Sequence, residues 1–293
     1  MEEREGKDEI NLMIEGGMIM ESNQQEILEK VASCINILGD FCGARDLPLL
    51  TREALFTNYG MEQVDVMVLF GGTILCGGDV LADAIHNKIA KTYIIVGGEG
   101  HTTAALREKI SEQFSELSVE HMSEASLFSA YLTRKYAFEP DYVECTSTNC
   151  GNNITFLLDL LKEEEISCNS ILLSQDATMQ LRMDAGLRKY APTLKIINYA
   201  TYKTAIKVVN GKLEYENIPL GMWSMERYIT LLMGEISRLS DDEMGYGPNG
   251  KGYISHVDIK ASVREAFCYL KEIYKDSVRS ADIRYKSFSK ENS

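Results

Sequence analysis

The 293-residue sequence is short of positive charge, with 30 Lys and Arg residues against 44 Asp and Glu and a formal net charge of −14. A protein that binds a nucleic-acid backbone needs a basic surface, so this imbalance argues against a nucleic-acid partner. No stretch approaches the roughly 20 apolar residues of a membrane span. The acidic N-terminus also lacks the basic start and apolar run of a signal peptide. We therefore expect a cytoplasmic protein without a membrane span.

Several common signatures of chemistry are missing. The seven cysteines are odd in number and contain no C-x-x-C pair, so we expect no metal site and mostly buried, reduced thiols. There is no P-loop lysine signature, no G-x-S-x-G elbow and no H-E-x-x-H motif. These absences disfavour the common P-loop nucleotide sites, serine hydrolases and zinc proteases.

The middle of the chain alternates between apolar runs and helical patterns. Helices are predicted at residues 81–91, from Thr103, at 123–137 with Ser123 as N-cap, at 152–165 and at 178–190. Buried strands are predicted at residues 64–70, 93–96, 141–145, 170–174 and 194–200. Strands separated by helices indicate right-handed crossovers and a mostly parallel sheet. The fold class expected is α/β, a Rossmann-like three-layer sandwich.

The flanks differ from this core, which we place at residues 61–200. Residues 1–60 contain helical patterns without convincing strands, which predicts an N-terminal helical extension. Residues 201–293 predict a C-terminal α+β extension, with a hairpin around Asn210-Gly211. Two helices, at 225–239 and about 260–275, and an irregular glycine-rich loop between them complete it.

In an open α/β sheet, ligands bind outside the carboxyl ends of the strands. That rule nominates the loops at residues 71–73, 97–103, 146–153 and 174–178. All four are enriched in glycine, hydroxyl, amide or acidic residues. Their convergence at one edge of the sheet predicts a binding pocket there.

The second of these loops partly matches the dinucleotide-binding fingerprint. Gly98 and Gly100 supply its first two glycines, but Thr103 stands where the third belongs, and the loop follows the second strand. An acid that would bind ribose, Glu124, falls within a helix and not at a strand end. A nicotinamide or flavin dinucleotide is therefore disfavoured. Two interpretations stay open: an anion-binding helix N-terminus, or a tight turn that glycine permits.

Other polar residues also have two interpretations. His101 is an exposed acid/base group or a local packing residue, and Asp176 binds a ligand or caps the helix that follows. The polar groups at Ser147, Thr148, Asn149 and Asn153 exceed what capping one helix requires. His256 and Asp258 form either a structural pair or a second acid/base element, and we favour the structural pair.

Four segments together carry a resemblance: "VGGEGHTT", "STNCGNN", "SQDATMQLR" and "ERYITLLMGEISRLSDDEMGYGPNGKGYISHVD". In combination they resemble the YdcF/SanA-like family of bacterial proteins, a DUF218 domain family of unknown function. The core resemblance covers about residues 64–200, and the last segment extends it to about Asp258, as in the YdcF branch. It implies a Rossmann-like core whose polar loops meet in a pocket, and S-adenosylmethionine binding with an unsettled reaction.

The loops and the resemblance together define the candidate site. The candidate catalytic residues are His101, Glu124 and Asp176. The candidate ligand-binding residues are Gly71, Gly72, Thr73, Gly97, Gly98, Ser147, Asn149, Asn153, Gln175, Met179 and Arg182. The chain departs from the family pattern twice. Asn152 replaces a usual Glu, which disfavours a carboxylate there, and Leu181 replaces a frequent Arg, which disfavours paired guanidinium groups for phosphate.

The function expected is a small-molecule binding protein for S-adenosylmethionine or a related adenosine ligand, with group transfer as one possible use. One alternative is a hydrolase or transferase that acts on a phosphorylated or cell-envelope intermediate. A second is a non-catalytic ligand sensor. The sequence leaves open whether the protein is an enzyme, and it leaves the oligomeric state open too.

Overall fold

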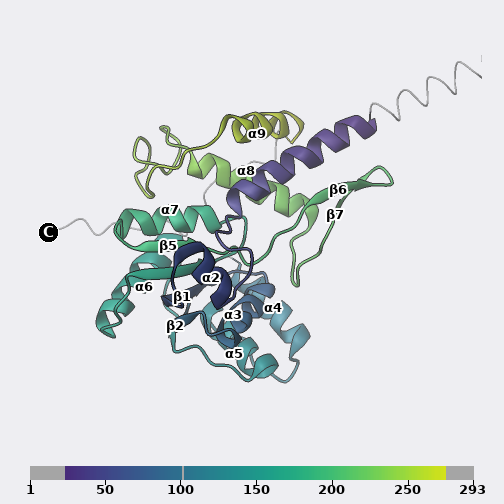
Figure 1. The fold of residues 1–293 in the computed structure, drawn as a ribbon. Coiled ribbons are helices and arrows are strands. Elements are labelled where there is room, and N and C mark those ends of the chain that lie inside the picture. Colours follow the sequence, from purple (N-terminus) through teal and green to yellow (C-terminus); the bar gives the residue numbers. More distant parts are fainter. Residues whose placement is uncertain (1–23, 101, 275–293) are drawn as a thin grey trace, which may run out of the picture.

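The computed structural model describes residues 24–100 and 102–274. Its centre is a five-stranded parallel sheet in the order β3-β2-β1-β4-β5 (Figure 1). The strands are β1 Val64–Phe70, β2 Ala90–Val96, β3 Tyr142–Glu144, β4 Ser170–Ser174 and β5 Lys195–Asn198. Helices cover both faces, so the predicted α/β, Rossmann-like fold is confirmed.

The central strand β1 shows how the sheet separates two cores. Met67 and Leu69 belong to one hydrophobic cluster, whereas Val66, Val68 and Phe70 belong to the other. Successive side chains of a strand point to opposite faces, so a continuous apolar run serves both sides. The first cluster packs α2 Arg52–Tyr59, α3 Cys76–His86, α4 Thr103–Gln113 and α5 Glu124–Tyr136, and the second packs α6 Cys150–Glu163 and α7 Gln180–Tyr190.

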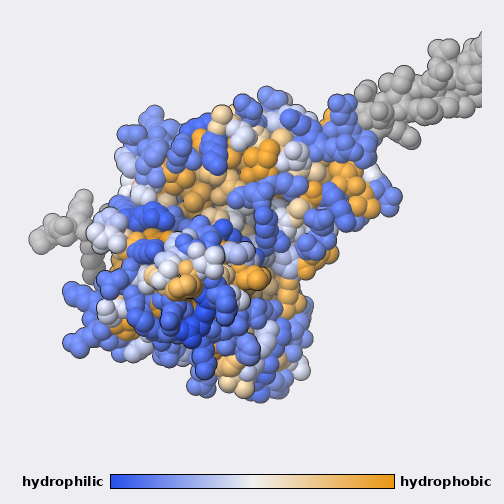
Figure 2. Space-filling model, in the orientation of Figure 1, coloured by the Kyte–Doolittle hydropathy of each residue, from blue (hydrophilic) through white to orange (hydrophobic). Residues whose placement is uncertain are grey.

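The two extensions pack together beside this sandwich. Residues 24–42 are helical and share a third hydrophobic cluster with α8 Met225–Leu239 and α9 Ala261–Ile273. The predicted hairpin is present as β6 Ile206–Val209 and β7 Lys212–Tyr215. Figure 1 shows these elements on one side of the sheet, with α8 next to α7 and the hairpin at the end away from α7. On the face shown in Figure 2, hydrophobic residues surface among them, within a mostly hydrophilic exterior.

The helix predicted at residues 81–91 is displaced. The structure has α3 at Cys76–His86, and β2 begins at Ala90. Lys88 has a φ of 53°, a left-handed conformation that ends the helix. The start of α3 is hard to predict from the sequence because Gly77 and Gly78 disfavour a helix. A Cβ at Gly78 would lie 2.5 Å from the ring of Tyr131, so the glycine allows α3 to pack against α5.

The cysteines are less buried than expected. Only Cys34 and Cys42 are buried, and Cys268 is exposed. All seven lie among the described residues, and none forms a disulfide there. In residues 24–100 and 102–274, no helix has both the length and the apolar character needed to cross a bilayer.

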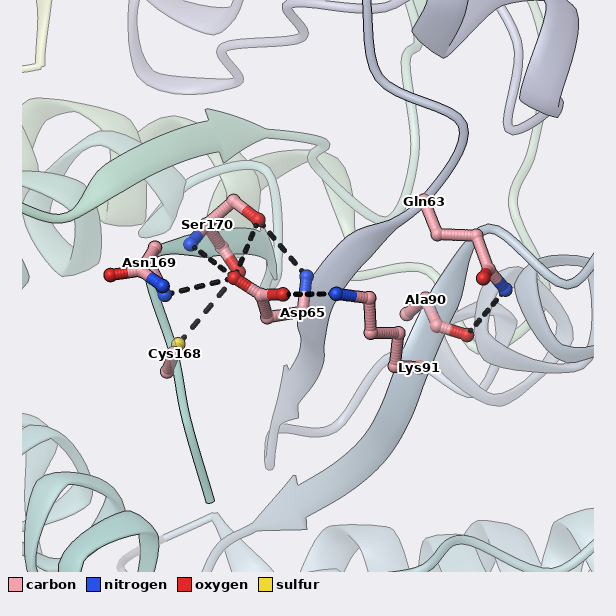
Figure 3. A network of polar contacts seen from close by, with 7 residues as sticks. All are labelled: Gln63, Asp65, Ala90, Lys91, Cys168, Asn169 and Ser170. Atoms are coloured by element: carbon pink, nitrogen blue, oxygen red, sulfur yellow. Dashed lines mark hydrogen bonds and ion pairs between the residues drawn. The ribbon is translucent and has the colours of Figure 1, made fainter.

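A polar network fixes three strands at their amino ends (Figure 3). Asp65 in β1 accepts hydrogen bonds from the backbone N–H groups of Asn169 and Ser170, at 2.9 and 3.1 Å, and from the Ser170 hydroxyl at 3.1 Å. Lys91 in β2 donates to the other carboxylate oxygen at 2.7 Å. The Ser170 hydroxyl in turn accepts from the Asp65 N–H at 3.0 Å. One carboxylate therefore ties β1 to both neighbouring strands.

We predict that Asp65→Ala lowers the free energy of unfolding by about 2 kcal/mol, because it leaves the N–H groups of residues 169 and 170 without an acceptor. Burial alone would raise the pKa of Asp65, but the hydrogen bonds from Lys91, Asn169 and Ser170 outweigh it and lower the pKa. The stabilisation is therefore present above the unfolded-state pKa and is lost as the pH falls through the folded-state value. Urea denaturation over a pH series measures both effects.

The matched control is Lys91→Met, which removes only an exposed ion pair and costs less than about 1 kcal/mol. Equal losses for the two variants would contradict a clamp centred on Asp65.

Candidate functional site

The chain reverses direction across the sheet between β1 and β4. From β1 it winds outward through β2 to β3, and it then returns to place β4 and β5 on the other side of β1. Ligands of open α/β proteins bind at such a switch point, outside the carboxyl ends of the strands. A cavity of about 290 Å³ lies there. The volume is near the lower end of the range typical of small-molecule sites.

Most of the predicted site residues line this cavity. They are Gly71, Gly72, Thr73, Gly98, Glu124, Ser147, Asn149, Asn153, Asp176, Met179 and Arg182. Gly97 and Gln175 do not line it. The Gln175 amide donates to the Gly71 carbonyl at 3.0 Å, so it joins the loops after β1 and β4. His101 lies outside the described residues.

Glycines bring the loops after β1, β2 and β3 into backbone contact. A Cβ at Gly97 would lie 3.0 Å from the Gly71 Cα, and one at Gly98 would lie 2.0 Å from the Ser147 carbonyl oxygen. Neither Gly97 nor Gly98 has a positive φ. These glycines therefore serve close backbone packing, and a left-handed turn is not the reason for them. Ser147 adds a hydrogen bond, since its hydroxyl accepts from the Gly98 N–H at 3.0 Å.

Glu124 is a buried carboxylic acid in the cavity wall. It is the first residue of α5, after the N-cap Ser123 predicted from the sequence. Its Oε1 accepts from the Thr103 hydroxyl at 2.9 Å and from the Thr102 hydroxyl at 3.4 Å. Burial raises the pKa of Glu124, and the hydrogen bonds from the two threonines oppose the rise. A carboxyl group with a raised pKa inside a cavity is suited to proton transfer.

Asp176 connects the core to the C-terminal extension. Its Oδ1 accepts from the N–H and hydroxyl of Thr178, both at 2.8 Å, and from the Tyr202 hydroxyl at 2.9 Å. Its Oδ2 accepts from Trp223 Nε1 at 2.9 Å. The interpretation of Asp176 as the N-cap of α7 is wrong, because Met179 holds that position. Four donors fix the carboxylate in place beside the cavity.

The loop before α6 presents polar groups as the sequence suggested. Asn149 is the N-cap, and its side chain accepts from the Asn152 N–H at 3.0 Å. The N–H groups of Cys150 and Gly151, both in the cavity wall, find no acceptor within residues 24–100 and 102–274. First-turn amides of this kind can hold an anion or an ester oxygen.

A buried ion-pair cluster forms another part of the wall. Glu235 in α8, only 2% exposed, accepts from Arg182 Nε at 2.5 Å and from Arg182 Nη2 at 3.0 Å. Arg238 Nη1 donates to the same carboxylate at 3.2 Å. Leu181 in place of an Arg disfavours paired guanidinium groups for phosphate, and that stays a prediction, but two guanidinium groups do lie together in the cavity wall. Arg238 supplies the second guanidinium from a segment far along the chain.

Sequence reasoning missed the part of the cavity that follows residue 200. Trp223, Leu231, Glu235, Arg238, Tyr246, Tyr253 and Ile254 all line it. Two features of the sequence could have pointed to this part of the cavity. Glu235 interrupts the apolar stripe of α8, where a lone acid requires a partner. Trp223 is the one tryptophan of the chain.

The expected pairing of His256 with Asp258 is wrong. His256 Nδ1 lies 2.6 Å from Asp241 Oδ2 instead, and residues 255–260 are not a strand. The pair holds the loop after α8 in shape, because Asp241 also accepts from the Asn249 N–H at 2.6 Å. Within the described part of the chain, no group of three or more His, Cys, Asp or Glu residues is arranged to hold a metal ion.

Compared with models of known protein families, the chain matches none.

We predict that Gly98→Ala destabilises the fold by at least about 2 kcal/mol, because its Cβ would meet backbone that cannot rotate away. The matched control is Gly100→Ala in the same loop, whose Cβ would meet nothing closer than Glu124 Oε1 at 3.9 Å. This control costs less than about 1 kcal/mol. Thermal and urea unfolding of both variants measure the difference, and similar losses would contradict the packing role of Gly98.

Proposed function

We propose that the chain binds S-adenosylmethionine or a related adenosine ligand in the cavity between β1 and β4. The observation that carries this proposal is the position and lining of that cavity. It lies at the switch point of a parallel sheet, among loops that bring backbone amides, hydroxyls and two acids to one space. The resemblance to the YdcF/SanA-like family supports the same ligand class.

The charges of the cavity suit a cationic ligand. Glu124 and Asp176 line it, the two arginines in its wall share Glu235, and no lysine among residues 24–100 and 102–274 lines it. A sulfonium ion carries its positive charge without needing the phosphate cradle that the sequence lacks. Trp223, Tyr246 and Tyr253 also line the cavity, and aromatic side chains are common partners of cations and adenine rings.

The cavity also contains unused hydrogen-bonding capacity. Thr73 is 1% exposed, and its hydroxyl has no partner among the residues that the structure describes. A buried hydroxyl without a partner costs free energy, so a rotation of this side chain toward a polar ligand in the cavity would be favourable. Glu124 and Asp176 provide acceptors for ribose hydroxyls in the same space.

A second candidate is a hydrolase or transferase for a phosphorylated intermediate. The observation that favours it is the pair of free N–H groups at Cys150 and Gly151, with the Arg182–Glu235–Arg238 cluster also in the cavity wall. Glu124, with its raised pKa, could supply a proton. Phosphatase activity abolished by Asp176→Ala, in a variant that still folds, would favour this function. Ligand binding without any turnover would favour a sensor.

Trp223 allows the main proposal to be tested directly. It lines the cavity and is the only tryptophan, so its fluorescence reports on that space without a label. We expect S-adenosylmethionine to change the emission saturably, and calorimetry to give the same affinity. The protein is first freed of copurifying ligand. No heat and no fluorescence change with S-adenosylmethionine or S-adenosylhomocysteine would refute the proposal.

We predict that S-adenosylmethionine binds more tightly as the pH rises through the pKa of Glu124. Burial raises that pKa, so the carboxyl group loses its proton, and gains the charge that attracts a cation, at a higher pH than an exposed glutamate. Glu124→Gln flattens this pH profile and weakens binding by about tenfold. The control is Glu116→Gln, at a side chain 58% exposed on the surface. A profile that Glu124→Gln leaves unchanged would count against a role for Glu124.

A further inference from the structure

We propose that Arg182 and Arg238 form a subsite for the carboxylate of the ligand. The inference rests on the proposed function and narrows it. The ligand class becomes a nucleoside that carries an amino-acid-like carboxylate as well as a positive charge.

The first argument is a local imbalance of charge. Two guanidinium groups share the single carboxylate of Glu235, so the cluster carries one net positive charge. All three side chains are largely buried, with exposures of 12% for Arg182, 14% for Arg238 and 2% for Glu235. An excess charge in such a place is unfavourable unless an anion joins it.

The second argument comes from the hydrogen-bond donors of the cluster. Arg182 uses Nε and Nη2 on Glu235, and Nη2 also contacts Met179 Sδ at 3.3 Å. Arg238 uses Nη1 on the same acid. Arg182 Nη1 and Arg238 Nε and Nη2 have no acceptor within residues 24–100 and 102–274. Both side chains line the cavity, so an oxyanion in it could accept from these groups.

The third argument concerns the kind of anion. The one net positive charge of Arg182, Arg238 and Glu235 is neutralised by a monoanion such as a carboxylate. A phosphate dianion would instead give the cluster a net negative charge, next to the buried carboxylate of Glu235. The remainder of the cavity carries Glu124 and Asp176, which suit a cation. A ligand with a carboxylate and a cationic centre satisfies both parts, and S-adenosylmethionine has both.

Arg238 is the better residue to change. Removing Arg182 would take two hydrogen bonds from a buried carboxylate, and such a loss typically destabilises a fold by several kcal/mol. After Arg238→Gln, Glu235 keeps both bonds to Arg182. Arg238→Lys restores the charge without the planar guanidinium. The control Arg134→Gln removes an arginine that is 51% exposed on α5, where it pairs with Glu116.

The probes are S-adenosylmethionine and its decarboxylated analogue, which differ only in the carboxylate. We expect the wild type and Arg134→Gln to bind S-adenosylmethionine at least about tenfold more tightly than the analogue. Arg238→Gln should reduce this preference to within about threefold without weakening binding of the analogue, and Arg238→Lys should restore part of it. Fluorescence of Trp223 and calorimetry give the affinities.

Two results would overturn the subsite while leaving the proposed function intact. They are equal affinities for the two probes in the wild type, and an Arg238→Gln variant that weakens both alike. If neither nucleoside binds, the proposed function fails, and L-methionine against L-methioninamide tests the subsite by itself. A preference for the acid that Arg238→Gln removes supports the subsite, and no preference overturns it.

Discussion

The candidate site depends on how closely three neighbouring strands can approach one another at their carboxyl ends. Gly71, Gly97 and Gly98 let the backbones after β1, β2 and β3 touch, with no side chain between them. That contact sets Ser147 against Gly98 and brings Glu124, at the start of α5, into the same space. Without these glycines the loops would separate, and their polar groups would face solvent one by one. A packing constraint on the backbone thus creates the chemical environment of the cavity.

Two polar contacts then connect the C-terminal extension to this edge of the sheet. Trp223 Nε1 donates a hydrogen bond to Asp176, and Arg182 donates two hydrogen bonds, from Nε and Nη2, to Glu235. Each contact joins a residue after β4 to a residue beyond position 200. Apolar packing holds α8 and α9 on the α7 side of the sheet, but apolar packing has little directional preference. The directional contacts determine which side chains beyond position 200 face the cavity.

Much of the fold could be predicted because short stretches of the sequence, such as apolar runs and turn or cap residues, indicate their own secondary structure. β1 and β4 are continuous apolar runs, and the Asn210-Gly211 hairpin and the Ser123 cap have strong local signatures. The errors arose where a distant contact overrode a local preference, as when the ring of Tyr131 explains Gly78 inside α3. The strand-end rule located the loops that line the cavity from the core. It could not locate Trp223 or Arg238, because no spacing along the sequence relates them to β4. The partner of His256 was missed because Asp241 becomes its neighbour only when the loop after α8 folds back.

Two parts of the chain form the cavity, the loops at the ends of the strands and the residues beyond position 200, and they tolerate substitution to different degrees. The wall from the sheet depends on backbone contacts at Gly71, Gly97 and Gly98, where even a methyl group has no room, so these positions restrict the sequence. The wall from residues beyond 200 is built of long side chains on α8 and on the loop after it, including Arg238, Tyr246 and Tyr253. Such side chains can be exchanged without moving a strand. Relatives of this protein could therefore acquire new ligands through that second wall alone, while the sheet and its crowded loops stay as they are.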